Sequence, residues 1–174
     1  DNPDFATARL LIDKMIESQP NNNALKTLQQ TVRNHTPIPH NGSVPKFAAY
    51  DINGKQVNNA MLAKADTAVV IAWATWNYNS MSMLQTVAQI QKEKGSKMKV
   101  LGVCLDYSRS LCRTALRQRD MNDIPTVCDG KAVDGDVYNR LGMSNLPDNI
   151  VIEKGRVTAT GLTLEQLRKK LGKE

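Results

Sequence analysis

The chain has 174 residues, of which 41% are hydrophobic and 5% aromatic, and its formal net charge is +6. This composition supports one domain with a small appendage, and no segment approaches the roughly 18 unbroken apolar residues of a membrane helix. The basic residues are scattered and aromatics are few, which argues against nucleic acid as a partner, because such a surface needs cations along one stripe.

Residues 1–41 are predicted to form an N-terminal helical segment. Residues 3–18 begin with Pro3 and carry apolar side chains on one face, and residues 24–33 form a second helix after an Asn-rich break. The chain opens without an initiator Met, so we expect a mature or trimmed form, with contact to a membrane only through a missing N-terminal anchor.

The linker that follows contains the two histidines, His35 and His40. No carboxylate or cysteine stands close to them in the sequence. Because a metal site needs several ligands, we predict that both are solvated loop residues.

Residues 42–174 alternate between strand and helix patterns, which predicts an α/β layered domain. An Asn53-Gly54 turn signal indicates a hairpin, and Thr163 to Gln166 matches a capping box at the start of a last helix. Strands are predicted at 47–51, 55–57, 67–74, 98–105, 124–128, 149–153 and 156–160, and helices from the turn after 74 to Lys94, from Ser108 or Ser110 to Arg119, at 136–141 and from Thr163.

The buried strand at 67–74 runs directly into Thr75-Trp76-Asn77-Tyr78-Asn79-Ser80, and an amphipathic helix leaves this turn. Asn and Ser suit turns and helix caps, so one interpretation is a purely structural turn in which Trp76 and Tyr78 cover the edge of the core. The other is a recognition surface, because aromatic side chains beside amides are good binding groups.

Three cysteines are present, Cys104, Cys112 and Cys128, none of them in Cys-x-x-Cys spacing. With the two histidines they show no zinc-type ligand grouping, so no metal and no cofactor are expected. Cys104 lies in a core strand. Cys112, near a helix start where a thiol pKa can be lowered, and Cys128 are the candidate reactive thiols. A disulfide of Cys128 with Cys104 or Cys112 stays open, although a structural role is favoured over catalysis.

Several short motifs follow one another in a characteristic order. They are Gly42 to Phe47 with Asp51 to Lys55, Ala72 to Trp76, Val103 to Asp106, and Leu146-Pro147 with Ile150 to Val157. Together they resemble the thioredoxin-like superfamily, in particular its TlpA-like branch of thiol–disulfide oxidoreductases and peroxiredoxin-like relatives. The resemblance implies a thioredoxin-like fold, a central mixed sheet flanked by helices, over 42–174, with a cis peptide bond at Leu146–Pro147.

The resemblance also shows what this chain lacks. The two positions of the family's Cys-x-x-Cys motif hold Asn77 and Ser80, and the position of a nearby acidic residue holds Met83. Neither an amide nor a hydroxyl exchanges with a disulfide. We therefore expect a redox-inactive thioredoxin-like domain with no catalytic residue at the turn.

The expected role is a binding or accessory module of the periplasm or cell envelope of a bacterium, with a lipid anchor. The resemblance implies a groove in which Trp76, Tyr78 and Asn79, with Leu146 and Pro147, bind an extended peptide or envelope protein. The alternative is a thiol–disulfide oxidoreductase or peroxide-reducing enzyme using Cys112 or Cys128. A third, weaker interpretation is a structural domain of a larger lipoprotein whose N-terminal helices belong to a dimerisation region.

Overall fold

The structure of the chain is a computed structural model that describes residues 5–34 and 38–172. The chain divides into two compact units between Pro37 and Ile38. The first unit is a pair of helices in contact with each other, α1 (Phe5–Ser18) and α2 (Asn23–Asn34). Both were predicted, and their observed bounds agree with the prediction within the described residues.

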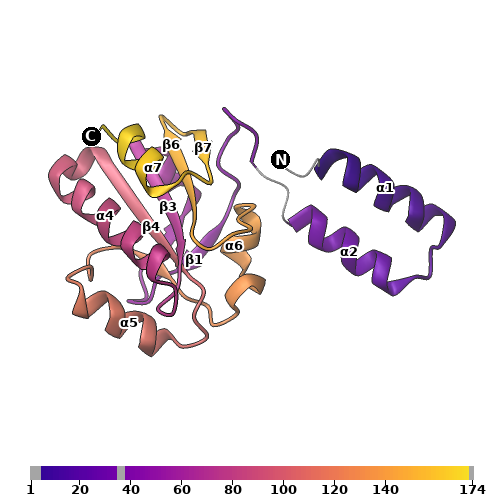
Figure 1. The fold of residues 1–174 in the computed structure, drawn as a ribbon, viewed down its shortest axis with the longest axis horizontal. Coiled ribbons are helices and arrows are strands. Elements are labelled where there is room, and N and C mark those ends of the chain that lie inside the picture. Colours follow the sequence, from indigo (N-terminus) through magenta and orange to yellow (C-terminus); the bar gives the residue numbers. More distant parts are fainter. Residues whose placement is uncertain (1–4, 35–37, 173–174) are drawn as a thin grey trace. The chain divides into compact units, whose positions relative to one another are not determined.

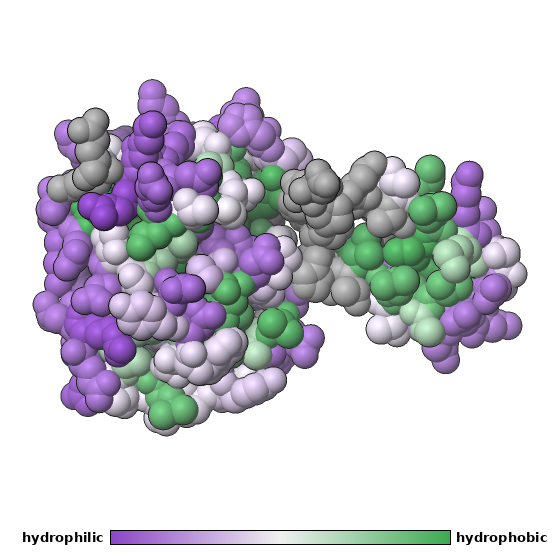
Figure 2. All heavy atoms as spheres, in the orientation of Figure 1, coloured by the Kyte–Doolittle hydropathy of each residue, from purple (hydrophilic) through white to green (hydrophobic). Residues whose placement is uncertain are grey.

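Few of the apolar side chains that the structure describes in the helical unit are buried. Ile12 and Leu25 are buried between the helices, whereas Leu10, Leu11, Met15 and Leu28 are about half exposed. Apolar side chains gather on the visible face of this unit (Figure 2). A two-helix unit of this size has too little interior to bury a complete apolar face.

A five-stranded mixed sheet forms the centre of the second unit, with the order β5-β4-β3-β6-β7 (Figure 1). Its central strand is β3 (Thr67–Trp73), an almost continuous apolar run, as expected for a strand buried on both faces. β4 (Met98–Cys104) and β5 (Thr126–Val127) continue the sheet in parallel on one side, and β6 (Asp148–Glu153) and β7 (Arg156–Thr160) in antiparallel fashion on the other.

Helices and a hairpin cover the two faces of this sheet. α4 (Tyr78–Lys94), α5 (Arg109–Gln118) and α7 (Leu164–Lys170) pack on one face, with Val69, Ile71 and Trp73 of β3 beneath them. The hairpin β1 (Ala48–Tyr50) and β2 (Gln56–Asn58), α3 (Asn59–Ala63) and α6 (Asp136–Arg140) pack on the other, with Val70 and Ala72. Alternate residues of a strand point to opposite faces, which produces these two cores. The predicted fold class is confirmed.

Two elements differ from the prediction. The helix α3 was missed because five residues are too few to show a helical period, although Asn58 caps it by accepting a hydrogen bond from the Met61 N–H at 3.0 Å. The strand expected at 124–128 is reduced to Thr126–Val127. Pro125 has no N–H to donate to a ladder, and only its carbonyl pairs, with the Gly102 N–H at 2.9 Å.

Within the described residues, no helix has the length and the apolar character that crossing a membrane requires.

Candidate functional site

The turn between β3 and α4 lies where the carboxyl ends of β3 and β4 meet. These strands are parallel, so the segments that follow them emerge at the same edge of the sheet. The Asp106 carboxylate, just after β4, accepts hydrogen bonds from the Thr75 N–H and the Thr75 hydroxyl, both at 3.0 Å. Asp106 is buried and fixes the turn against β4.

Asn77 is the N-cap of α4. Its backbone is extended, and its side-chain oxygen accepts a hydrogen bond from the Ser80 N–H at 2.9 Å. The first N–H groups of a helix have no partner within the helix, and an Asn side chain at this position satisfies one of them. The Asn77 side chain is thus used to begin the helix.

Ser80 is fully buried, and its hydroxyl has partners on both sides. The oxygen accepts from the Ala74 N–H at 3.1 Å, and the hydroxyl lies 2.9 Å from the Asn77 carbonyl, to which it donates. A hydroxyl held in this way closes the turn upon itself. It offers nothing to an incoming substrate.

Met83 is buried next to Asn149, whose side-chain amide lies 3.5 Å from the Met83 sulfur. Asn149 also binds both backbone groups of Leu162, donating to its carbonyl at 2.7 Å and accepting from its N–H at 3.2 Å. A thioether carries no exchangeable proton, so proton transfer through residue 83 is absent.

Trp76 and Tyr78, by contrast, point away from the core. Their exposed fractions are 68% and 83%, so the interpretation that they cover the core edge is wrong. The hydrogen-bonded side chains of half-buried Asn77 and buried Ser80 therefore lie next to two exposed aromatic side chains. Neighbouring exposed apolar side chains are candidates for contact with a binding partner.

The turn stands between two hollows. One, of about 490 Å³, is lined by Trp76, Leu105, Tyr107, Ala132, Val133, Tyr138, Ser144, Asn145 and Leu146. The other, of about 360 Å³, is lined by Asn79, Ser82, Met83, Pro147 and residues 161–164. Trp76 and Asn79 of the predicted groove thus line these hollows together with Leu146 and Pro147, whereas Tyr78, also predicted there, lines neither.

Sequence reasoning missed Tyr107 and Val133, which line the larger hollow and are exposed. Tyr107 follows Asp106 directly after β4, and its place at the end of a strand beside the turn was a usable signal. Val133 lies in a short 3₁₀ turn, Ala132–Asp134, for which the sequence has no periodic pattern.

The Leu146–Pro147 peptide bond is cis in the structure. The loop before it is held by Asp148, whose carboxylate accepts hydrogen bonds from the Ser144 N–H at 2.9 Å and the Asn149 N–H at 2.8 Å. Burial raises the pKa of Asp148, although these backbone donors act in the opposite direction. The carboxylate positions the loop and is not exposed to the hollows.

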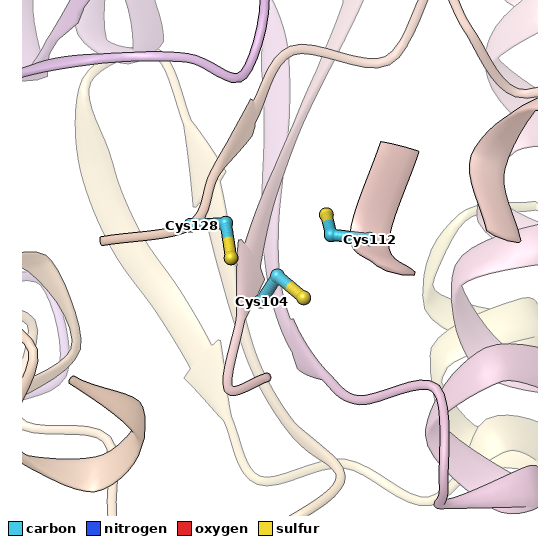
Figure 3. Close-up of side chains that lie close together, drawn as sticks. All are labelled: Cys104, Cys112 and Cys128. Atoms are coloured by element: carbon cyan, nitrogen blue, oxygen red, sulfur yellow. The ribbon is translucent and has the colours of Figure 1, made fainter. Parts of the chain in front are cut away.

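The three cysteines come together, contrary to the expectation that they form no ligand grouping. Their sulfur atoms all lie within 4.8 Å of one another (Figure 3). Cys104 ends β4, Cys112 lies in α5, and Cys128 directly follows β5, so 24 residues of sequence separate the outer two (128 − 104). The spacing of the cysteines in the sequence does not predict this cluster, because strand pairing and helix packing bring the three residues together.

All three thiols are free and buried. Contrary to expectation, the pKa of Cys112 is raised: the contact with Cys104 favours its thiolate, but the contact with Cys128 and burial outweigh it. The pKa of Cys128 is lowered because the Cys104 and Cys112 thiols can donate to its sulfur. Burial closes these thiols to a disulfide or peroxide substrate, so the predicted enzymatic alternative has no accessible nucleophile in this conformation.

Comparison with known proteins identifies other structures with this fold. No protein-family model matches the chain, and no curated protein sequence matches it. Solved structures do match. The C-terminal domain of a protein described as a thiol-disulfide oxidoreductase from Bacteroides thetaiotaomicron is 23% identical, with a TM-score of 0.64, over 76% of this chain and 93% of that one.

Two further structures give the same result. A DsbF homologue from Corynebacterium diphtheriae is 21% identical, with a TM-score of 0.62, over 74% of this chain and 83% of that one. A secreted disulfide oxidoreductase from Mycobacterium tuberculosis is 14% identical, with a TM-score of 0.60, over 72% and 93%. The chain therefore has the thioredoxin-like fold found in thiol–disulfide oxidoreductases.

Proposed function

We propose that the second unit is a thioredoxin-like binding module without redox chemistry, which recognises an extended peptide segment beside the turn. One observation carries the proposal. The Asn77 and Ser80 side chains are occupied by hydrogen bonds within the turn, while Trp76 and Tyr78 next to them are exposed. In this proposal the Asn77 and Ser80 side chains hold the turn in place and take no part in a reaction, and the neighbouring aromatic rings are available to a ligand.

The larger hollow indicates what kind of segment would bind. Within the described part of the chain, its lining residues carry no formal charge, and they include two exposed aromatics, Trp76 and Tyr107. Burying an uncompensated charge there would be costly. The proposed ligand is therefore an uncharged, apolar stretch of an extended peptide or envelope protein, with one side chain inserted between the two rings.

The proposed location is the periplasm or cell envelope of a bacterium, where an N-terminal anchor would hold the domain at the membrane. Support comes from the fold of a structure described as a secreted disulfide oxidoreductase.

Binding is tested with a displayed library of ten-residue peptides, followed by calorimetry on the selected sequences. We expect Trp76→Ala and Tyr107→Ala each to weaken binding at least tenfold, as truncation of a central aromatic anchor does. Tyr50→Ala is the matched control: Tyr50 is an exposed aromatic on β1 that lines neither hollow, and its loss should leave affinity unchanged. Selected peptides that bind Trp76→Ala as well as the unmodified protein would contradict the proposal.

The absence of redox chemistry is tested separately, with insulin disulfide reduction in dithiothreitol. The unmodified protein should not exceed the uncatalysed rate. The Asn77→Cys/Ser80→Cys double variant should exceed it, because the α4 N-terminus favours a thiolate at residue 77. Reductase activity of the unmodified protein would overturn the proposal, and a folded but inactive double variant would show that more than the sulfurs has been lost.

A further inference from the structure

The cysteine cluster contains three of the best ligands for a thiophilic metal ion in one buried place. Cys104, Cys112 and Cys128 are each at most 2% exposed, and their sulfurs lie within 4.8 Å of one another. A zinc–thiolate bond of about 2.3 Å places two ligands of a tetrahedral site about 3.8 Å apart. The sulfurs therefore need to approach by at most about 1 Å.

Each sulfur is carried by a different element of the fold. Cys104 is the last residue of β4, Cys128 follows β5, which is paired with β4, and Cys112 projects from the first half of α5 (Figure 3). Ligands on packed strands and helices are held more firmly than ligands on loops. The site is thus positioned by the sheet itself.

An oxygen donor stands beside the sulfurs. The Asp106 Oδ2 atom lies 3.2 Å from the Cys104 sulfur, and the Asp106 carbonyl lies 3.4 Å from the Cys128 sulfur. Carboxylate oxygens bind zinc at about 2.0–2.2 Å. Asp106 is buried, so its remaining lone pairs face protein rather than bulk water.

We propose that Cys104, Cys112 and Cys128 form a buried site for a thiophilic divalent cation of the Zn²⁺ class, with the Asp106 carboxylate as the fourth ligand. On binding, every proton that the three thiols still carry leaves to solvent as three metal–sulfur bonds form, and no atom changes oxidation state. Three thiolates fully ionised without a cation would repel one another in this dry cluster, and a divalent ion offsets that charge.

Charge decides between Zn²⁺ and Cu⁺, the two ions that thiolates select. Three thiolates and one carboxylate carry four negative charges, of which Zn²⁺ neutralises twice as many as Cu⁺ does. The Arg109 guanidinium, whose Nε donates to the Cys128 carbonyl at 2.7 Å, adds a positive charge at the same edge. A four-ligand set that includes an oxygen also matches tetrahedral Zn²⁺.

The site would be coupled to the turn. Asp106 holds the Thr75 N–H and hydroxyl with the same carboxylate that faces Cys104. A metal ion that fixes this carboxylate would also fix the start of the turn that carries Trp76. Metal binding would then also reduce the mobility of the turn that carries Trp76.

The experiment is an anaerobic titration of reduced, chelator-treated full-length protein with Co²⁺, followed by displacement with Zn²⁺. We expect one equivalent of Co²⁺ to bind with sulfur-to-cobalt charge-transfer absorption, and Zn²⁺ to abolish that absorption. Cys104→Ser, Cys112→Ser and Cys128→Ser should each lower Zn²⁺ affinity at least 100-fold. Asp106→Asn should lower it about 10–100-fold.

The matched control is the His35→Ala/His40→Ala double variant, which removes both histidines of the chain and should bind unchanged. Because a serine in the core can prevent folding, the unmodified protein is also tested. Excess Zn²⁺ should raise its melting temperature by at least about 5 °C and protect its thiols from alkylation. Any of the following results would overturn the proposal. Co²⁺ binds without charge-transfer absorption, Cys112→Ser binds Zn²⁺ as tightly as the unmodified protein, or the histidine variant binds more weakly. The same holds if Zn²⁺ does not raise the melting temperature, or if the protein binds Cu⁺ alone.

Discussion

Tyr138 shows at the scale of one residue how burial sets chemistry near the site. Its ring is buried on α6 and lines the larger hollow, and its hydroxyl donates to the Asn145 carbonyl at 3.3 Å. Burial, followed by the charge of Asp148, raises the pKa of Tyr138 to about 12. The folded state thus holds this proton more tightly than the unfolded chain, in which a tyrosine titrates near pH 10.

The raised pKa gives a prediction about stability in alkali. Because the folded pKa is the higher one, the stabilising effect of Tyr138 is fully present below about pH 10 and is lost as the pH rises through about 12. Between these values the unmodified protein should lose about 1–3 kcal/mol more free energy of unfolding than Tyr138→Phe does. Urea unfolding at pH 8, 10, 11 and 12 measures this.

Tyr50→Phe is the control for the alkaline measurement, since Tyr50 is exposed on β1. It should follow the unmodified protein at every pH. Parallel pH profiles for Tyr138→Phe and the unmodified protein would show that the Tyr138 phenol does not control alkaline stability.

At the scale of one element, the start of α4 is fixed by a helix cap. Asn77 accepts from the Ser80 N–H, and the Ser80 hydroxyl closes onto Ala74 and Asn77. Both residues now stabilise the junction of β3 and α4. The N-terminus of a helix is electropositive and attracts an anion. In α4 the partial negative charge of the Asn77 amide oxygen takes that place.

This role of Asn77 is measurable. Asn77→Ala removes the acceptor of the Ser80 N–H and should lower the free energy of unfolding by about 1 kcal/mol. Asn77→Asp keeps an acceptor and adds a negative charge at the positive end of the helix, so it should stay within about 0.5 kcal/mol of the unmodified protein. Urea midpoints at pH 7 provide the comparison, and equal losses in both variants would exclude a capping role.

At the scale of the whole molecule, the two units have separate interiors. The two hydrophobic clusters of the sheet unit are built entirely from residues at or beyond Ile38. The sheet unit therefore contains its own source of stability.

We expect a chain of residues 38–174 to fold with a free energy of unfolding within about 1 kcal/mol of the full chain, because both clusters remain complete. Tryptophan fluorescence in urea is a suitable measurement, since Trp73 and Trp76, the two tryptophans of the chain, lie in this unit. A loss of more than about 2 kcal/mol on removing residues 1–37 would show that the helical unit contributes to the sheet unit's stability.

The sequence by itself determined the local features of this protein. The apolar run of β3, the Asn53-Gly54 turn with Gly54 at a φ of 81°, and the Thr163–Gln166 capping box all appear as predicted. Such features depend on contacts between near neighbours, which residue type and period reveal directly.

Only the tertiary structure decided what surrounds the turn. It exposed Trp76 and Tyr78, set Tyr107 and Val133 beside Trp76, and gathered Cys104, Cys112 and Cys128 into one buried cluster. These arrangements follow from the pairing of Val103 with Val127 and from the packing of α5 on the sheet. Burial is a property of the assembled core, and a spacing of 8 or 16 residues in the chain does not encode which side chains will meet there.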